Sequence, residues 1–225
     1  MAVYSSEDFA VTKLETNRPF RTVLFAVGRA GDPRRHLPFL EALAERGCRV
    51  VAPHFDMLAS HVPSNEELDE RLARLEQALS IHAPDDVPVI GVGHSIGSTM
   101  LLTLAGAIGM TMSGTRFACA RKYSFDRLVL LAPATAFFRE PGALDALRVP
   151  IRIWVGRKDA ITPPDHAASL QTALEGKCSV DVRVADDAGH FTFMNQPPPG
   201  MEEPHPDRDV FLSELVHDIE EFMES

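Results

Sequence analysis

The 225-residue sequence has few cysteines, few basic residues and no long apolar run, and each shortage excludes a class of protein. The three cysteines, Cys48, Cys119 and Cys178, are odd in number and lack metal or redox spacing, so we expect free thiols in a reducing compartment. Lys and Arg number 22 against 32 Asp and Glu; the resulting net charge of -10 argues against a nucleic-acid partner. No segment approaches eighteen uninterrupted apolar residues, and residues 1–20 lack the apolar core of a signal peptide. The composition therefore predicts a soluble, cytoplasmic protein without a membrane partner.

Cofactor motifs are also missing from the sequence. There is no GxGxxG motif, no Walker loop and no cluster with metal-ligand spacing. We therefore expect no cofactor and no metal, whereas the oligomeric state stays open.

Short apolar runs bounded by Gly or Pro alternate with helical periods along the chain. The runs have the β-branched composition of buried parallel strands, and they are TVLFAVG (22–28), CRVVAP (48–53), VPVIGVG (87–93), RLVLLAP (127–133), PIRIWVG (150–156) and SVDVRVA (179–185). Helical periods cover 36–47, 64–82, 96–108, 164–176 and 207–224. This alternation predicts one α/β domain over residues 1–225, with a mostly parallel sheet of about six to seven strands between two helical layers. The segment DFAVTKL (8–14) is expected to add an edge strand.

The stretch GVGHSIGSTM (91–100) carries a G-x-S-x-G motif directly after the third main strand. Such a motif arises by chance in about one chain in ten of this length, so the motif alone does not identify a nucleophile. In the predicted fold, however, Ser95 lies at the C-terminal end of a parallel strand, where open α/β sheets hold their ligands. A sharp strand-to-helix turn exposes the serine hydroxyl, and Gly93 and Gly97 allow strand and helix to pack closely. Ser95 is therefore predicted to be a nucleophile.

Two later strand ends supply the base and the acid that a serine nucleophile needs. Asp159 follows the strand that ends in WVG, and His190 follows the next one, which gives the chain order Ser95, Asp159, His190 of a catalytic triad. Asp165 fits a helix N-cap and ranks below Asp159 as the acid, and the loop after the preceding strand offers only the distant Glu140. The other histidines near these loops are interpreted as structural or surface residues: His54, His61, His94 and His166.

The segments GHSIG, GRKDAITPP and AGHF resemble the α/β-hydrolase family over almost the whole chain, and within it the dienelactone-hydrolase-like and platelet-activating-factor-acetylhydrolase-like bacterial branch. The resemblance implies a metal-independent hydrolase whose oxyanion hole is formed by the amide of Arg29, and the free N-H of Ile96 at the helix start supplies a second donor. In one departure, Val27 stands where the family usually carries histidine before Gly28, and this is expected to loosen or re-aim the loop. A serine rather than a cysteine nucleophile also argues against the dienelactone reaction.

The predicted pocket is open, because only residues 134–149 separate two strands between which many relatives insert a lid. Little or no lid is therefore expected, and an apolar wall suits a short acyl or aryl group. Phe137 and Phe138 fit the core equally well, and the Arg29 side chain either holds an anionic group or faces solvent. The predicted substrate-binding residues are Phe55, Met57, Phe137, Phe138, Ile161 and Phe191.

These residues together predict a serine hydrolase that cleaves a small-molecule carboxylic ester or thioester through an acyl-enzyme intermediate. Two alternatives stay open: an amide or peptide hydrolase, and a non-catalytic binding protein on a hydrolase scaffold, which the lost histidine motivates. A histidine base has an ordinary pKa of about 6.5, so activity is expected to fall below that pH.

Overall fold

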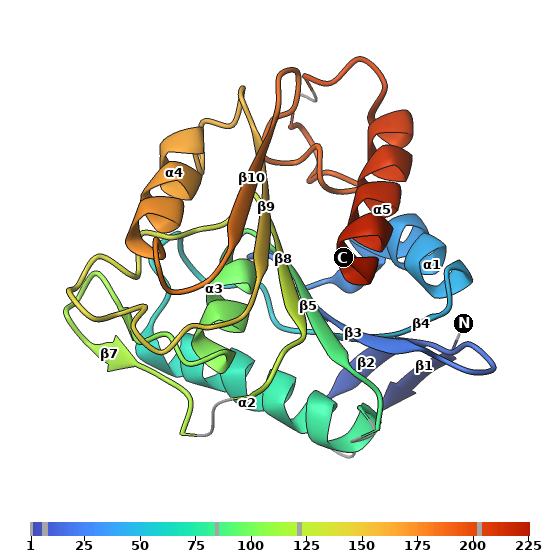
Figure 1. The fold of residues 1–225 in the computed structure, drawn as a ribbon, viewed down its shortest axis with the longest axis horizontal. Helices are drawn as coiled ribbons and strands as arrows, with labels where there is room; N and C mark the ends of the chain where they lie inside the picture. The colour runs from blue at the N-terminus through green and yellow to red at the C-terminus, as the bar shows by residue number, and fades with distance from the viewer. Residues whose placement is uncertain (1, 6–8, 84–85, 121–122, 202–203) are drawn as a thin grey trace.

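A single eight-stranded sheet forms the centre of the molecule (Figure 1). The computed structural model describes residues 2–5, 9–83, 86–120, 123–201 and 204–225. The strand order is β1-β2-β4-β3-β5-β8-β9-β10; β1 and β2 run antiparallel to their neighbours, and the other pairs are parallel. The strand bounds are β1 Ala2–Ser5, β2 Ala10–Leu14, β3 Arg21–Ala26, β4 Cys48–Pro53, β5 Val89–His94, β8 Arg127–Leu131, β9 Ile151–Gly156 and β10 Val180–Ala185.

All six predicted main strands are confirmed, but the edge strand is not the predicted one. β2 forms within the predicted segment 8–14, of which residue 8 lies outside the described residues. However, β2 is an inner strand, because β1 pairs with it on its free side and brings the sheet to eight strands. The short run Ala2–Ser5 carries too little pattern by itself to be recognised as a strand.

Helices cover both faces of the sheet, as the uninterrupted apolar strands require. Helices α1 (Leu37–Glu45) and α5 (Arg208–Glu224) pack on one face, and α2 (Asn65–His82), α3 (Ile96–Leu104) and α4 (Pro164–Ala173) pack on the other (Figure 1). Each helical layer buries its own apolar cluster against the sheet. Among the described residues, no helix has both the length and the apolar character needed to cross a membrane.

Local signals in the sequence explain the start of α2 and the end of α3. The predicted capping box at the start of α2 forms, since Ser64 Oγ accepts a hydrogen bond from Glu67 N and the Glu67 carboxylate accepts one from Ser64 N. α3 ends at Leu104, four residues before the predicted end, because Gly106 adopts a left-handed φ of 111°. A small hairpin, β6 (Gly109–Met110) and β7 (Arg116–Phe117), follows and was not expected.

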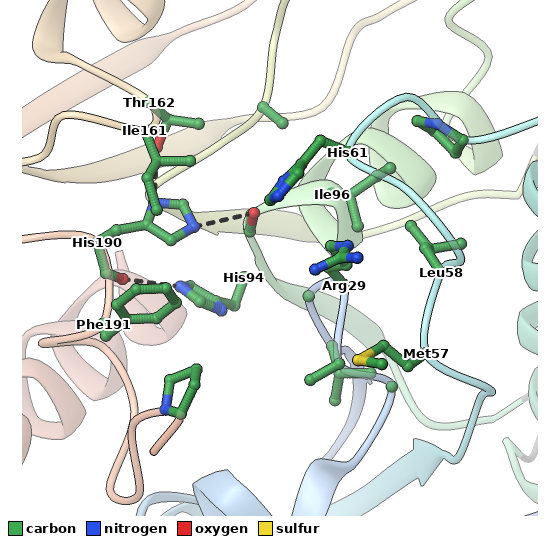
Figure 2. Close-up of a pocket in the computed structure, with 18 of the residues that line it drawn as sticks. Arg29, Met57, Leu58, His61, His94, Ile96, Ile161, Thr162, His190 and Phe191 are labelled. Atoms are coloured by element: carbon green, nitrogen blue, oxygen red, sulfur yellow. Dashed lines mark hydrogen bonds between the residues drawn. The ribbon is translucent and has the colours of Figure 1, made fainter. Parts of the chain in front are cut away.

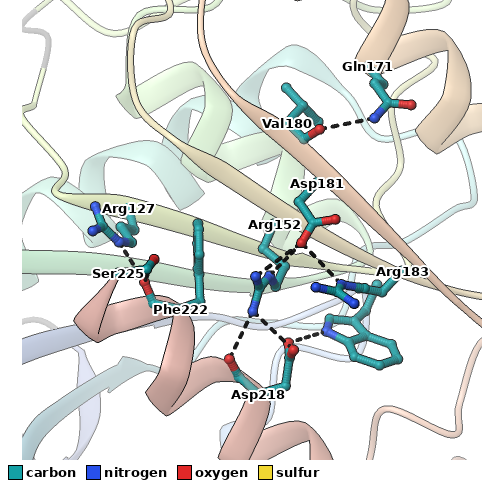
Figure 3. Close-up of polar contacts among 10 residues, drawn as sticks. Arg127, Arg152, Gln171, Val180, Asp181, Arg183, Asp218, Phe222 and Ser225 are labelled. Carbon is teal, nitrogen blue, oxygen red and sulfur yellow. Dashed lines mark hydrogen bonds and ion pairs between the residues drawn. The ribbon is translucent and has the colours of Figure 1, made fainter.

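Polar contacts attach the C-terminal helix α5 to the parallel strands (Figure 3). Arg152 of β9 donates to the Asp218 carbonyl and to Asp218 Oδ1, both at 3.0 Å, and it also pairs with Asp181 of β10. Trp154 Nε1 donates to the other Asp218 oxygen at 2.8 Å, and Arg127 of β8 donates to the Phe222 carbonyl. These contacts hold α5 on strands β8 and β9.

Candidate active site

Ser95 occupies a strained turn between β5 and α3. Its φ of 55° and ψ of -122° lie outside the regions that residues with a side chain normally adopt. Backbone hydrogen bonds hold this conformation: Ser95 N donates to Leu131 O at 2.9 Å, and Ser95 O accepts from Ser98 N at 3.0 Å. The turn also requires glycine at 97, because a Cβ there would lie 2.0 Å from Ala26 O. The close approach of β5 and α3 therefore holds the Ser95 hydroxyl at the C-terminal end of β5.

His190 and Asp159 lie beside this hydroxyl, each from the loop that follows a parallel strand. His190 Nε2 is 3.0 Å from Ser95 Oγ, and His190 Nδ1 is 2.8 Å from Asp159 Oδ2. Both side chains are buried, with 7% of His190 and 4% of Asp159 exposed. The structure thus brings together the three residues that the sequence singled out, although they are up to 95 positions apart in the chain.

Asp159 is held in the ionised form by its hydrogen-bond partners. Burial raises the pKa of this carboxyl, but the hydrogen bonds and charge of His190 and the bonds from Thr162 outweigh burial and lower the pKa below its ordinary value. Asp159 Oδ1 accepts the backbone N-H groups of Ile161 and Thr162 at 2.8 Å each. Both carboxylate oxygens are therefore fixed, and one of them is directed at the imidazole.

Thr162 is a part of the site that the sequence analysis missed. Its hydroxyl lies 2.8 Å from Asp159 Oδ2, 3.0 Å from His190 Nδ1 and 3.1 Å from Ala132 O. The available signal was the spacing, because a threonine three positions after an aspartate often closes a local side-chain turn. Asp165, the lower-ranked acid, was expected at a helix N-cap but lies in the first turn of α4, whose N-cap is Pro163.

His94, next to the serine, packs behind the site instead of facing it. His94 Nε2 lies 3.0 Å from the His190 carbonyl, which only accepts, so Nε2 carries the proton. The other ring nitrogen, Nδ1, is buried without a hydrogen-bond partner in the described part of the chain. Burial lowers the pKa of His94 well below its ordinary value, so the ring is neutral. His94 thereby ties the loop of His190 to β5.

The loop after β3 lies next to the serine. A Cβ on Gly28 would lie 3.4 Å from Ser95 Cβ and 3.2 Å from His94 Nδ1, so this position fits only glycine without displacement. Arg29 follows Gly28, and Ile96 is the first residue of α3. Neither backbone amide donates a hydrogen bond to a described residue. Within the described structure, two N-H groups without an acceptor therefore border Ser95, one on the loop after β3 and one at the start of α3.

A largely apolar cavity of about 680 Å³ opens in front of Ser95. Figure 2 shows Arg29, Ile96 and His61 across from His190, with Phe191 beside the imidazole and Met57 further along the wall. Residues 134–149 contain no helix, so the predicted absence of a helical lid agrees with the structure. Four methionines add to the wall and were not expected from the sequence: Met110 of β6, and Met112, Met194 and Met201.

The predicted pocket residues separate into two groups. Met57, Phe137, Ile161 and Phe191 line the cavity. Two predictions are wrong. Phe138 is only 8% exposed and packs in the core. The Phe55 ring packs against the guanidinium of Arg71 on α2 instead of facing the cavity. The sequence does not say which residues of an irregular loop point inward, because no periodicity orders their side chains.

Comparisons with known proteins show which solved structures share this architecture. No family model and no curated protein matches the sequence. Among solved structures, an α/β-hydrolase enzyme from a sediment metagenome of the Mar Chica lagoon, Morocco, aligns over 100% of both chains at 13% identity with a TM-score of 0.64. Esterase 2 of Thermogutta terrifontis with propionate bound aligns over 99% of this chain and 92% of its own at 16% identity (TM-score 0.69), and the same enzyme has been observed phosphorylated by paraoxon.

An esterase of Pyrococcus furiosus aligns over 99% of this chain and 88% of its own, with 14% identity and a TM-score of 0.65. The narrower resemblance to the dienelactone-hydrolase-like branch stays a prediction. The sheet order, the turn at Ser95 and these similarities lead to one conclusion: the chain has the α/β-hydrolase fold.

Proposed function

We propose that this protein is a metal-independent serine hydrolase that cleaves a carboxylic ester or thioester. The observation that carries the proposal is the row of hydrogen bonds from Ser95 Oγ through His190 to Asp159, at 3.0 and 2.8 Å, opening on an apolar cavity. The esterases among the similar structures support the proposal, although their identity to this chain is low.

The geometry suits acyl transfer in two steps. Ser95 Oγ attacks the carbonyl carbon while its proton passes to His190 Nε2, and the Asp159 carboxylate stabilises the imidazolium through Nδ1. The amides of Arg29 and Ile96 stabilise the oxyanion. When the C-O or C-S bond to the leaving group breaks, His190 gives its proton to that group and the acyl-enzyme remains. Water then attacks, its proton passes to His190, and Ser95 recovers a proton as the acid is released.

Replacement of the nucleophile tests the proposal directly. Ser95→Ala is expected to lower turnover of p-nitrophenyl butyrate by ~10⁴-fold or more, and fluorophosphonate is expected to label wild type at Ser95, as read by mass spectrometry. Ser98→Ala is the matched control, because Ser98 lies in the first turn of α3 next to Ser95 but its hydroxyl donates to Gly93 O at 2.8 Å. The control should keep both the activity and the label.

The same assay separates the alternatives. A p-nitroanilide analogue cleaved faster than the ester would favour an amide or peptide hydrolase. Folded wild type with neither turnover nor label would contradict the serine-hydrolase proposal and favour a non-catalytic binding protein.

A further inference from the structure

In the loop after β3, Val27 stands where the α/β-hydrolase family usually carries histidine. A buried arginine of α2 forms hydrogen bonds with the backbone of this loop. Arg71 of α2 is 3% exposed. Its Nη1 donates to Gly28 O at 3.1 Å and approaches Val27 O at 3.5 Å, and its Nη2 donates to Arg29 O at 3.1 Å and Asp56 O at 3.0 Å. The four terminal N-H groups of the guanidinium are therefore directed at four backbone carbonyls. Three of these carbonyls belong to consecutive residues of the loop, Val27, Gly28 and Arg29.

These contacts set the direction of the loop amides. A peptide group is planar and trans, so its N-H points opposite to its C=O. Because Arg71 holds Gly28 O on the side of α2, the N-H of Arg29 in the same peptide group must point away from α2. Two backbone donors reinforce the arrangement, since Gly31 N donates to Gly28 O at 3.1 Å and Leu58 N donates to Arg29 O at 3.2 Å.

The arginine is itself well held and charged at neutral pH. Phe55 packs against the guanidinium, with its ring centroid 4.9 Å from Arg71 Cζ. Burial lowers the pKa of Arg71 to about 10, which leaves the side chain protonated at neutral pH. A buried positive charge on the carbonyl side of a peptide group also polarises its N-H and strengthens it as a donor.

We propose that Arg71 is a positioning residue for the oxyanion hole, which holds the Arg29 amide toward the carbonyl oxygen of the substrate in a chain that has valine at the usual histidine position. The proposal rests on the proposed hydrolase function. We expect that lysine cannot replace this arginine. A guanidinium has two terminal nitrogens that bind carbonyls on both sides, whereas a lysine has a single ammonium that cannot reach all of them.

Variants at Arg71 test the role. Arg71→Lys keeps the charge and Arg71→Met keeps much of the volume; in both, kcat for p-nitrophenyl butyrate should fall by ~10²-fold, as for loss of one oxyanion donor, with KM within about threefold of wild type. A trifluoromethyl ketone forms an oxyanion on Ser95, so its inhibition constant should rise in parallel with the loss of kcat/KM. If Arg71 contributed only to the stability of the fold, the inhibition constant and kcat/KM would not change in parallel.

Arg74→Met is the matched control, because Arg74 is another arginine of α2, partly buried, that donates to His54 O at 3.1 Å, outside the loop. It should keep the wild-type kcat even if it lowers Tm as much as Arg71→Met does. A folded Arg71→Met variant with kcat within about threefold of wild type would overturn the proposal, and so would an equal loss of kcat in Arg74→Met.

Amide hydrogen exchange over residues 27–31, measured without substrate, separates this proposal from the proposed function. Faster exchange is expected in both Arg71 variants and not in Arg74→Met. Unchanged exchange and unchanged activity would overturn the role of Arg71 while hydrolysis stands. Wild type without turnover or label would overturn the hydrolase proposal and, with it, the role of Arg71 in positioning an oxyanion hole, whereas the exchange result would still report whether Arg71 anchors the loop.

Discussion

Three histidine rings lie in a row at the site, and only His190 contacts the serine. The ring centroids of His36 and His94 are 5.3 Å apart, and those of His94 and His190 are 5.0 Å apart. His36 is buried, and its Nδ1 bonds to Phe193 O at 3.1 Å. Burial lowers the pKa of His36 to about 4, so this ring, like His94, is neutral at pH 7. Both rings support the loop that carries His190.

A loss of stability in mild acid follows from these buried rings. The folded-state pKa of His36 lies below the unfolded value, so the unfolded state binds more protons between about pH 6.5 and 4 and the free energy of unfolding decreases as pH falls through that range. His36 contributes a loss on the order of 3 kcal/mol by pH 4. Urea unfolding at pH 7.5, 6 and 5 measures the decrease. His36→Asn, which keeps a donor for Phe193 O, should be less stable at pH 7.5 and show a shallower pH dependence; an equally steep dependence would contradict this account.

At the scale of elements, one carboxylate of α5 binds two side chains of β9, in addition to the apolar packing of the helix on the sheet. Asp218 is 18% exposed and accepts hydrogen bonds from Arg152 and from the Trp154 indole. Asp218→Ala leaves both donors short of a partner, so we expect a loss of about 2 kcal/mol in the free energy of unfolding. Glu214→Ala, at an exposed position of the same helix, should change it by less than about 0.5 kcal/mol. Urea denaturation measures both variants, and equal stabilities would show that α5 does not depend on this contact.

At the scale of the whole molecule, loops from both halves of the chain enclose a cavity larger than a short acyl group needs. Met57 and Met112 are 64% and 77% exposed and lie on its wall. If the substrate acyl chain occupies this apolar space, each buried methylene contributes up to ~0.8 kcal/mol, or about fourfold in kcat/KM. We therefore expect kcat/KM to rise from p-nitrophenyl acetate to octanoate. A maximum at acetate, in the same series, would mean that the acyl group does not enter the cavity.

Local information in the sequence determined the main strands, the helices and the three residues of the proposed triad. Apolar runs and helical periods are properties of neighbouring residues, and the connection rules of parallel sheets place successive strand ends at one edge. Ser95, Asp159 and His190 each follow such a strand end, so their meeting could be predicted without coordinates.

Only the tertiary structure decided the contacts between side chains that no local pattern relates. Arg71 meets the carbonyl of Gly28 across 43 positions, and the direction of its guanidinium depends on the packing of α2 against the sheet. The inner position of β2 likewise depended on β1, a four-residue strand that is defined by its pairing. The inward or outward direction of Phe55 and Phe138 was settled in the same way, because irregular loops have no period and their side chains turn wherever the surrounding packing leaves room.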